Sequence, residues 1–159
     1  MNYFICGFSG AGKSTILKEI ASHSEVKLNC IDLDDHIFLN HGHGYEKLGD
    51  FIEAVGLDHF RALEFSTLMS LNMNDNQLVS LGGGALNEQT IGILSGWSGF
   101  WLNTDFDTCW ERISQDESRP LARLGKEGMR ELYSQRLIMF KGYPKLVSIL
   151  QLIEISKDS

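Results

Sequence analysis

The segment Gly7-Phe8-Ser9-Gly10-Ala11-Gly12-Lys13-Ser14 decides the fold of this chain. It completes the pattern GxxxxGK[ST], and it lies between an apolar run, Tyr3–Cys6, and a helix-like run, Thr15–Ala21. A strand before this pattern and a helix after it form the context in which such a loop binds phosphate. Glycine lets the backbone approach an anion closely, and the helix N-terminus adds a favourable dipole. The sequence therefore predicts a nucleotide-binding phosphate loop.

Individual positions of this loop have separate expected tasks. Lys13 is expected to reach the β- and γ-phosphates, and Ser14 is expected to bind Mg²⁺. The other expected ATP-binding positions of the loop are Gly10, Ala11, Gly12 and Thr15. The motif alone does not identify a kinase, because GTPases, ATPases and motor domains share it.

Outward from the loop, short apolar runs alternate with helix-like segments. The runs of strand length are Tyr3–Cys6, Val26–Ile31, Leu78–Leu81, Phe100–Leu102 and Leu146–Ile155. Fully apolar strands that alternate with helices predict a parallel sheet covered on both faces, which is the three-layer α/β arrangement. Ligands then bind at the carboxyl ends of the strands.

The composition describes a single globular domain. The chain has 159 residues, of which 43% are hydrophobic, and this is about the length of one domain. A net charge of −7 disfavours nonspecific binding to nucleic acid or to an anionic membrane. Three widely spaced cysteines fit a reducing compartment, and no apolar stretch approaches the roughly 18 residues of a membrane span. We therefore expect a soluble, cytoplasmic protein that binds neither nucleic acid nor a membrane.

Three carboxylates, of which the first two alternate with Leu33, follow the second apolar run, in Ile31-Asp32-Leu33-Asp34-Asp35. Because they alternate as the chain leaves a strand, Asp32 is the better candidate for the water shell of Mg²⁺ and Asp34 for contact with an accepting hydroxyl. The alternative is structural, with Asp34 or Asp35 capping a helix over 36–40.

A glycine triplet and several arginines are the remaining candidates for a binding site. Gly82-Gly83-Gly84 follows the third run and suggests close backbone approach to a ligand, although a plain turn is the alternative. Guanidinium groups suit carboxylates and phosphates, although each alone is more often a surface residue or part of an ion pair. The arginines concerned are Arg61, Arg112, Arg119 and Arg136. Glu64 lies three residues after Arg61 on the same helical face and is able to fix its rotamer.

In order along the chain, these elements resemble the shikimate kinase family, from Tyr3 to about Tyr143. The matching residues are the phosphate loop 7–14, Asp32 with Asp34, Phe60-Arg61 with Glu64, Gly82–Gly84, Arg119-Pro120-Leu121 and Arg136. The resemblance implies a three-layer P-loop kinase fold with a five-stranded parallel sheet of order 2-3-1-4-5. It also implies transfer of the ATP γ-phosphate to the 3-hydroxyl of shikimate, with Mg²⁺ as cofactor, in a single domain over 1–159 that we expect to be monomeric.

The resemblance also implies residue roles. Asp34 would hold the ring hydroxyls and orient or deprotonate the nucleophile. Arg61 and Arg136 would pair with the shikimate carboxylate, beside the glycine triplet. Arg119 would stabilise the transferring phosphoryl from a mobile lid over about 116–128, and Arg112 would lie against adenine. The expected catalytic residues are thus Lys13, Asp34 and Arg119, and the expected metal site is Ser14 with Asp32.

The chain departs from the family pattern at a few positions. Ser9 stands where the family usually has Met, and Phe140 replaces a common aromatic hydroxyl. The chain also ends soon after the last predicted strand, so an adenine-contacting loop and a terminal helix are expected to be short or absent.

Two other functions remain open. The first is another small-molecule P-loop kinase, such as one acting on gluconate, and the second is a nucleotide-binding module without catalysis. The two arginines and the glycine triplet favour shikimate over gluconate, and the complete catalytic set argues against an inactive module.

Overall fold

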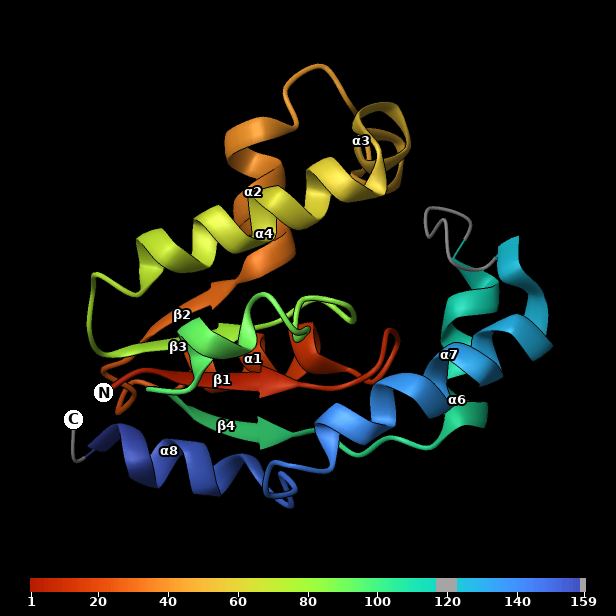
Figure 1. Cartoon of the computed structure of the whole chain (residues 1–159). Helices are drawn as coiled ribbons and strands as arrows, with labels where there is room; N and C mark the ends of the chain where they lie inside the picture. The colour runs from red at the N-terminus through yellow and green to blue at the C-terminus, as the bar shows by residue number, and fades with distance from the viewer. Residues whose placement is uncertain (117–122, 158–159) are drawn as a thin grey trace.

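The computed structural model describes residues 1–116 and 123–157, which form three layers around a parallel sheet (Figure 1). The four strands of the described part lie in the order β2-β3-β1-β4. Their bounds are β1 Tyr3–Cys6, β2 Asn29–Asp32, β3 Gln77–Ser80 and β4 Ser98–Trp101. The predicted α/β class and parallel sheet are confirmed.

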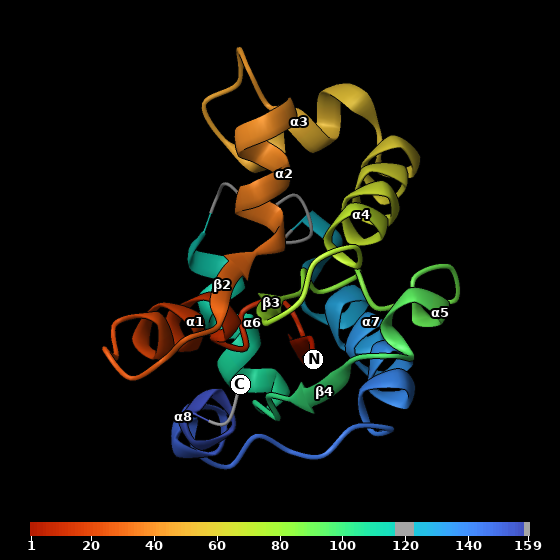
Figure 2. The same ribbon diagram turned by 90° about the vertical axis from the view of Figure 1, so that its left-hand side faces the viewer.

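Helices cover both faces of this sheet. Figure 2 shows α1 and α8 on one side of the strands and α4, α5 and α7 on the other. The helices are α1 Lys13–Ala21, α2 Leu33–His41, α3 Leu48–Val55, α4 Leu57–Leu71, α5 Ile91–Leu94, α6 Phe106–Gln115, α7 Gly125–Phe140 and α8 Ile149–Lys157.

Side chains of the strands alternate between two cores. Ile5, Leu78 and Phe100 pack with the buried residues of α1 and α8. Phe4 and Val79 point to the opposite face and join the core beneath α4 and α7. Because successive residues of a strand face opposite sides, a strand covered on both faces must be apolar throughout. Strand β1, Tyr3–Cys6, follows this rule, whereas the edge strand β2 carries polar residues at both ends, Asn29 and Asp32, and none of its residues is fully buried.

The fifth predicted strand is wrong. Among the described residues after β4, Lys145 alone pairs with this strand, through an isolated parallel bridge to Trp101. The Trp101 N–H donates to the Pro144 carbonyl at 2.8 Å, and the Leu146 N–H donates to the Trp101 carbonyl at 2.7 Å. The order 2-3-1-4-5 is therefore observed as far as 2-3-1-4, and a single bridge takes the place of the fifth strand.

The apolar run 146–155 mostly forms helix α8 rather than a strand. A terminal helix of nine residues is therefore present, so of the two expectations, a short or an absent helix, the second is wrong. Its buried residues are Leu152, Ile153 and Ser156. Together with the partly buried Ile149, they recur at the i, i+3, i+4 and i+7 spacing of one helical face. That periodicity distinguishes this run from the strands, which are shorter.

All four strands point the same way, so the loops that follow them meet at one edge of the sheet. These loops are 7–12 after β1, the start of α2 after β2, 81–85 after β3 and 102–105 after β4. The candidate residues of the sequence are concentrated in them. In a parallel sheet this edge is where ligands bind.

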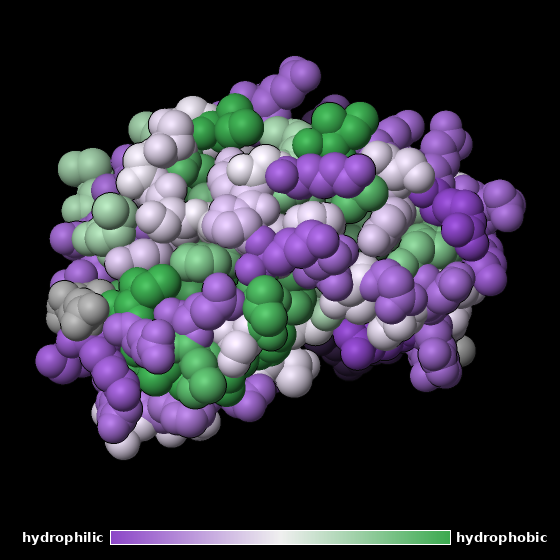
Figure 3. Space-filling view, turned by 90° about the horizontal axis from the view of Figure 1, so that it is seen from below, coloured by the Kyte–Doolittle hydropathy of each residue, from purple (hydrophilic) through white to green (hydrophobic). Residues whose placement is uncertain are grey.

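The surface seen from below is mainly hydrophilic, with separate hydrophobic patches (Figure 3). Val147, just before α8, and Leu150, in the first turn of α8, are among the strongly exposed hydrophobic residues of the described chain. Among the described helices, none combines the length and apolar character that crossing a membrane requires.

Candidate active site

The phosphate loop is held open by its own backbone geometry and by three neighbouring side chains. Gly10 and Gly12 have φ values of 79° and 99°, which favour glycine. The Lys13 ammonium donates to the carbonyls of Gly7 at 2.6 Å and Phe8 at 2.7 Å. Thr104 Oγ1 donates to the Ala11 carbonyl at 2.7 Å, and Arg112 Nη1 donates to the Gly10 carbonyl at 3.0 Å.

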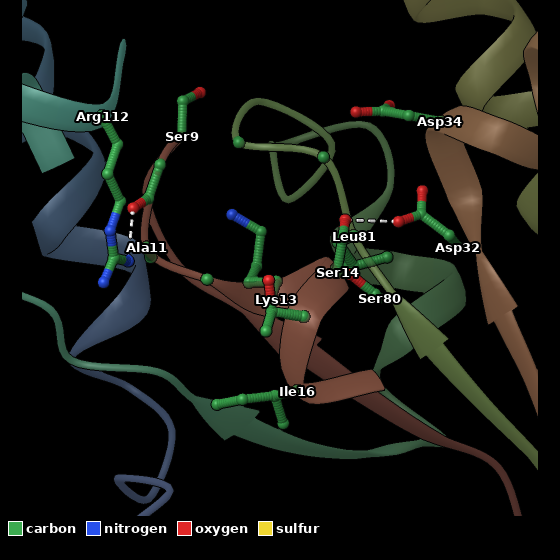
Figure 4. A pocket seen from close by; sticks show the side chains of 15 residues that line it. Ser9, Ala11, Lys13, Ser14, Ile16, Asp32, Asp34, Ser80, Leu81 and Arg112 are labelled. Atoms are coloured by element: carbon green, nitrogen blue, oxygen red, sulfur yellow. Dashed lines mark hydrogen bonds between the residues drawn. The ribbon is translucent and has the colours of Figure 1, made fainter. Parts of the chain in front are cut away.

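A cavity of about 510 Å³ lies over this loop (Figure 4). It is lined by all the predicted ATP-binding residues that the structure describes, including Arg112. We call it the loop cavity; its lining also includes Asp32, Asp34, Gly82 and Gly83. Lys13 is 8% exposed, so its charge lies in a largely desolvated position beside the cavity. Such a cavity suits an anionic ligand.

Ser14 and Asp32 form an oxygen pair that fits Mg²⁺. Ser14 Oγ donates to Asp32 Oδ2 at 2.5 Å, and Asp32 Oδ1 accepts from the Asp35 N–H at 3.1 Å. Asp32 is therefore the N-cap of α2, and the structural alternative, in which Asp34 or Asp35 caps this helix, is wrong. Mg²⁺ usually takes one or two protein oxygens and keeps several waters, so this pair is a suitable donor set.

Each glycine of the triplet faces a different candidate side chain. A Cβ on Gly82 would lie 2.7 Å from Asp34 Oδ1, and one on Gly84 would overlap the Arg61 guanidinium. A Cβ on Gly83 would overlap Ser9 Oγ and lie 3.2 Å from Arg136 Nη1. The backbone of the triplet thus lies close against candidate side chains of the site. Its close approach to a ligand stays a prediction.

Arg61, Glu64 and Arg136 form a buried charged cluster. Arg61 Nη1 donates to Glu64 Oε1 at 2.5 Å, which fixes the rotamer of Arg61 as expected. Glu64 is fully buried, and its Oε2 has no hydrogen-bond partner within the described chain. Burial raises the pKa of Glu64 to about 7, against the opposing charge of Arg61.

Arg136 brings an unsatisfied donor to the same place. Its Nη1 is buried without a hydrogen-bond partner among the described residues. Burial, with the nearby charge of Arg61, lowers the pKa of Arg136 to about 10. A buried guanidinium that lacks a partner favours an anionic ligand, because the ligand would supply the missing acceptor.

Asp34 lies between the two groups of residues. Burial and the charge of Asp32 raise the pKa of Asp34 to about 6, while Lys13 and Arg61 act to lower it. Its Oδ1 has no hydrogen-bond partner among the described residues. Asp34 is therefore largely ionised at neutral pH and has a free acceptor for a ligand hydroxyl.

A second cavity, of about 550 Å³, contains this cluster; we call it the arginine cavity. Arg61, Glu64, Gly84 and Arg136 line it, together with residues from α3 and the start of α4. Six residues line both cavities, and we call them the shared wall: Ser9, Ser14, Asp32, Asp34, Gly82 and Gly83. A group bound in one cavity is thus adjacent to a group bound in the other.

The structure brings every described candidate residue to these two cavities. Arg119, and the part of the predicted lid over 117–122, lie outside the described residues. Of the remaining predicted lid, residues 123–124 are helical and Gly125 begins α7.

Two contributions were missed by the sequence reasoning. Thr104 supports the phosphate loop, and the Tyr133 hydroxyl in turn donates to the Thr104 carbonyl at 3.1 Å. The sequence signal for Thr104 was its position in the loop that follows β4, at the edge of the sheet where ligands bind. Leu48, Ile52 and Leu57 supply an apolar wall of the arginine cavity. Their residue types are ordinary core types, so nothing in the sequence marked them.

Comparison with known proteins gives a consistent family. The family model described as shikimate kinase matches residues 9–149. A shikimate kinase of Persephonella marina is 31% identical over 137 residues, which cover 85% of this chain and 80% of that protein. One from Helicobacter hepaticus is 32% identical over 150 residues, which cover 92% and 84%.

A solved structure of similar fold is the shikimate kinase from Acinetobacter baumannii in complex with shikimate. It superimposes with a TM-score of 0.80 at 21% identity, covering 97% of this chain and 89% of that one.

Proposed function

The chain belongs to the shikimate kinase family, and from this premise we propose how its residues phosphorylate shikimate at the expense of ATP. The observation that carries the proposal is the shared wall between the loop cavity and the arginine cavity. The terminal phosphoryl group of a nucleotide in the loop cavity would then lie next to an acceptor in the arginine cavity. Phosphoryl transfer depends mainly on such positioning and on charge stabilisation.

We assign the nucleotide to the loop cavity. The backbone of Gly10–Thr15 would surround the phosphates, with Lys13 supplying positive charge and Arg112 contributing at the edge of the loop. Ser14 and Asp32 would hold Mg²⁺, which neutralises phosphate charge when bound.

We assign shikimate to the arginine cavity. Its carboxylate would pair with Arg61 and with the unsatisfied Nη1 of Arg136, and Glu64 would keep Arg61 in place. Asp34 would accept a hydrogen bond from the reacting hydroxyl and take its proton as the bond to phosphorus forms. The role of Arg119 in charge stabilisation rests on its sequence motif.

An ADP-release assay tests this proposal. Purified protein with Mg-ATP would be given shikimate, gluconate or no acceptor in parallel. Release that depends on shikimate supports the proposal, whereas release with gluconate alone points to the other small-molecule kinase. An absence of release with every acceptor, in protein that binds ATP, points to the noncatalytic module.

A further inference from the structure

Ser9 is a member of the shared wall that has no task in the assignment above. It is the residue of the phosphate loop whose Oγ lies against Gly83, because a Cβ added to that glycine would overlap it. Figure 4 shows Ser9 and Asp34 on either side of the loop that follows Leu81. Ser9 is partly buried, and its hydroxyl makes no hydrogen bond to the rest of the described chain.

Three observations place this hydroxyl on the acceptor side of the wall. First, Arg136 Nη1 lies 3.2 Å from the same virtual Cβ of Gly83 that Ser9 Oγ overlaps. Second, that guanidinium nitrogen lacks a hydrogen-bond partner in the described chain. Third, Arg136 lines the arginine cavity and is not part of the loop cavity. A hydroxyl and a guanidinium donor therefore converge on one small region of the arginine cavity.

Resting on the proposed function, we propose that Ser9 is a specificity-determining residue, whose hydroxyl hydrogen-bonds an oxygen of the bound acceptor beside the one held by Arg136. The other loop side chains near this point cannot take this place. Lys13 turns to the carbonyls of Gly7 and Phe8, and Ser14 turns to Asp32. Ser9 thus gives the nucleotide-binding loop a direct contact with the second substrate.

The chemistry of the contact favours a polyhydroxylated anion. A hydroxyl both donates and accepts, so it is able to pair with a carboxylate oxygen or with a ring hydroxyl. Gly83 has no side chain to separate Ser9 from the ligand. An acceptor without an oxygen at this point would leave the Ser9 hydroxyl unsatisfied, which a partly buried site penalises.

The test compares steady-state constants of the wild type with those of Ser9→Ala and Ser9→Cys. We expect both variants to raise the KM for shikimate roughly 3- to 10-fold, the range of one neutral hydrogen bond. The KM for ATP and kcat should change less than twofold. Ser9→Cys keeps the side-chain size with a weak hydrogen-bonding group, so an unchanged KM for shikimate in both variants would overturn the proposal.

The KM for ATP distinguishes a contact between Ser9 and the acceptor from a purely structural role of Ser9. If Ser9 only shapes the phosphate loop, its replacement would raise the KM for ATP by the same factor as that for shikimate, which would also overturn the proposal. Ser22→Ala is the matched control, because it removes an exposed hydroxyl just beyond the other end of α1. All three constants of this control should match the wild type.

Shikimate analogues that each lack one ring oxygen identify the partner of Ser9. The loss of the contacted oxygen should weaken binding to the wild type, and it should have no further effect in Ser9→Ala. Full additivity for every analogue and for the carboxylate amide would contradict the contact. A wild type that releases no ADP with shikimate would instead refute the proposed function itself.

Discussion

If Asp34 takes the proton of the acceptor hydroxyl, as proposed, the reaction should depend on the ionisation of this one residue. Its pKa is raised to about 6, so the basic form gains population as pH rises from 5 to 7. We expect kcat/KM for shikimate to increase over this range and to level off above it, with an apparent pKa near 6. Initial rates at saturating Mg-ATP, with enough coupling enzyme at each pH, measure the profile.

The variant Asp34→Asn provides the internal check for this profile. We expect it to lose roughly 10²–10⁴ in kcat, because the amide cannot take the proton. The residual activity should no longer rise between pH 5 and 7. A wild-type midpoint near 4, or an unchanged slope in the variant, would rule out Asp34 as the titrating group.

Arg61 is the second residue whose substitution should have an effect of predictable size, here on the affinity for shikimate. Arg61→Ala removes one proposed partner of the acceptor carboxylate and leaves Glu64 buried without its ion pair. We expect shikimate binding to weaken by about 2–4 kcal/mol, measured as Kd by calorimetry. Arg130→Ala is the control, since Arg130 is half exposed on α7 and pairs with Asp107 outside both cavities. An equal Kd for Arg61→Ala and the wild type would remove Arg61 from the carboxylate site.

The residues of the site were more predictable than its walls. Lys13, Ser14 and the glycines follow a spacing that phosphate binding requires, so they can be identified without a structure. Ser9 occupies a variable position of the same loop, and only the approach of Gly83 reveals its surroundings. The walls from α3 are apolar residues whose part in a cavity depends on tertiary packing.

At the scale of elements, substitutions in α8 should change the stability of the fold without changing the activity. Leu152 is fully buried in the core that α8 shares with α1 and the sheet, whereas Leu150 on the same helix is 61% exposed. We expect Leu152→Ala to lower the free energy of unfolding by about 2–5 kcal/mol, and Leu150→Ala by less than about 0.5 kcal/mol. Urea denaturation measures both.

Neither substitution touches the cavities, which lie at the carboxyl edge of the sheet. The KM values for ATP and shikimate should therefore stay within twofold of the wild type at temperatures where the variants are folded. A large change in KM for Leu152→Ala alone would show that α8 also sets the geometry of the site.

The same helix shows why the element boundaries were only partly predictable. Strands β1 and β3 are short apolar runs between turn residues, and these features are local in the sequence. The run 146–155 is also apolar, yet it is ten residues long and contacts one face of α1, so its helical period decides its conformation. Within this part of the described chain, Lys145 forms a single bridge to β4, and helix α8 begins four residues later at Ile149.

At the scale of the molecule, the buried carboxyls make stability depend on pH. The pKa values of Asp34 and Glu64 are raised in the folded protein, to about 6 and about 7. The native state therefore binds more protons than the unfolded state between about pH 4 and 7, and the free energy of unfolding falls as pH rises through this window. We expect a loss of roughly 2–4 kcal/mol between pH 5 and 7.5.

Denaturation of the ligand-free protein at several pH values measures this slope. Glu64→Gln should flatten the part between about pH 5 and 7, because the amide does not ionise. Glu53→Gln is a suitable control, since Glu53 is exposed in its ion pair with Arg123. Stability that rises with pH in this range would contradict the assigned shifts.

The six residues of the shared wall also make the two substrates thermodynamically dependent on one another. On the proposed assignment, a nucleotide with Mg²⁺ that orders Ser14 and Asp32 also orders part of the surface that shikimate would meet. By linkage, whatever factor a nonhydrolysable ATP analogue applies to the affinity for shikimate, shikimate must apply to the affinity for the analogue. The order in which the two ligands bind would then leave the total binding free energy unchanged.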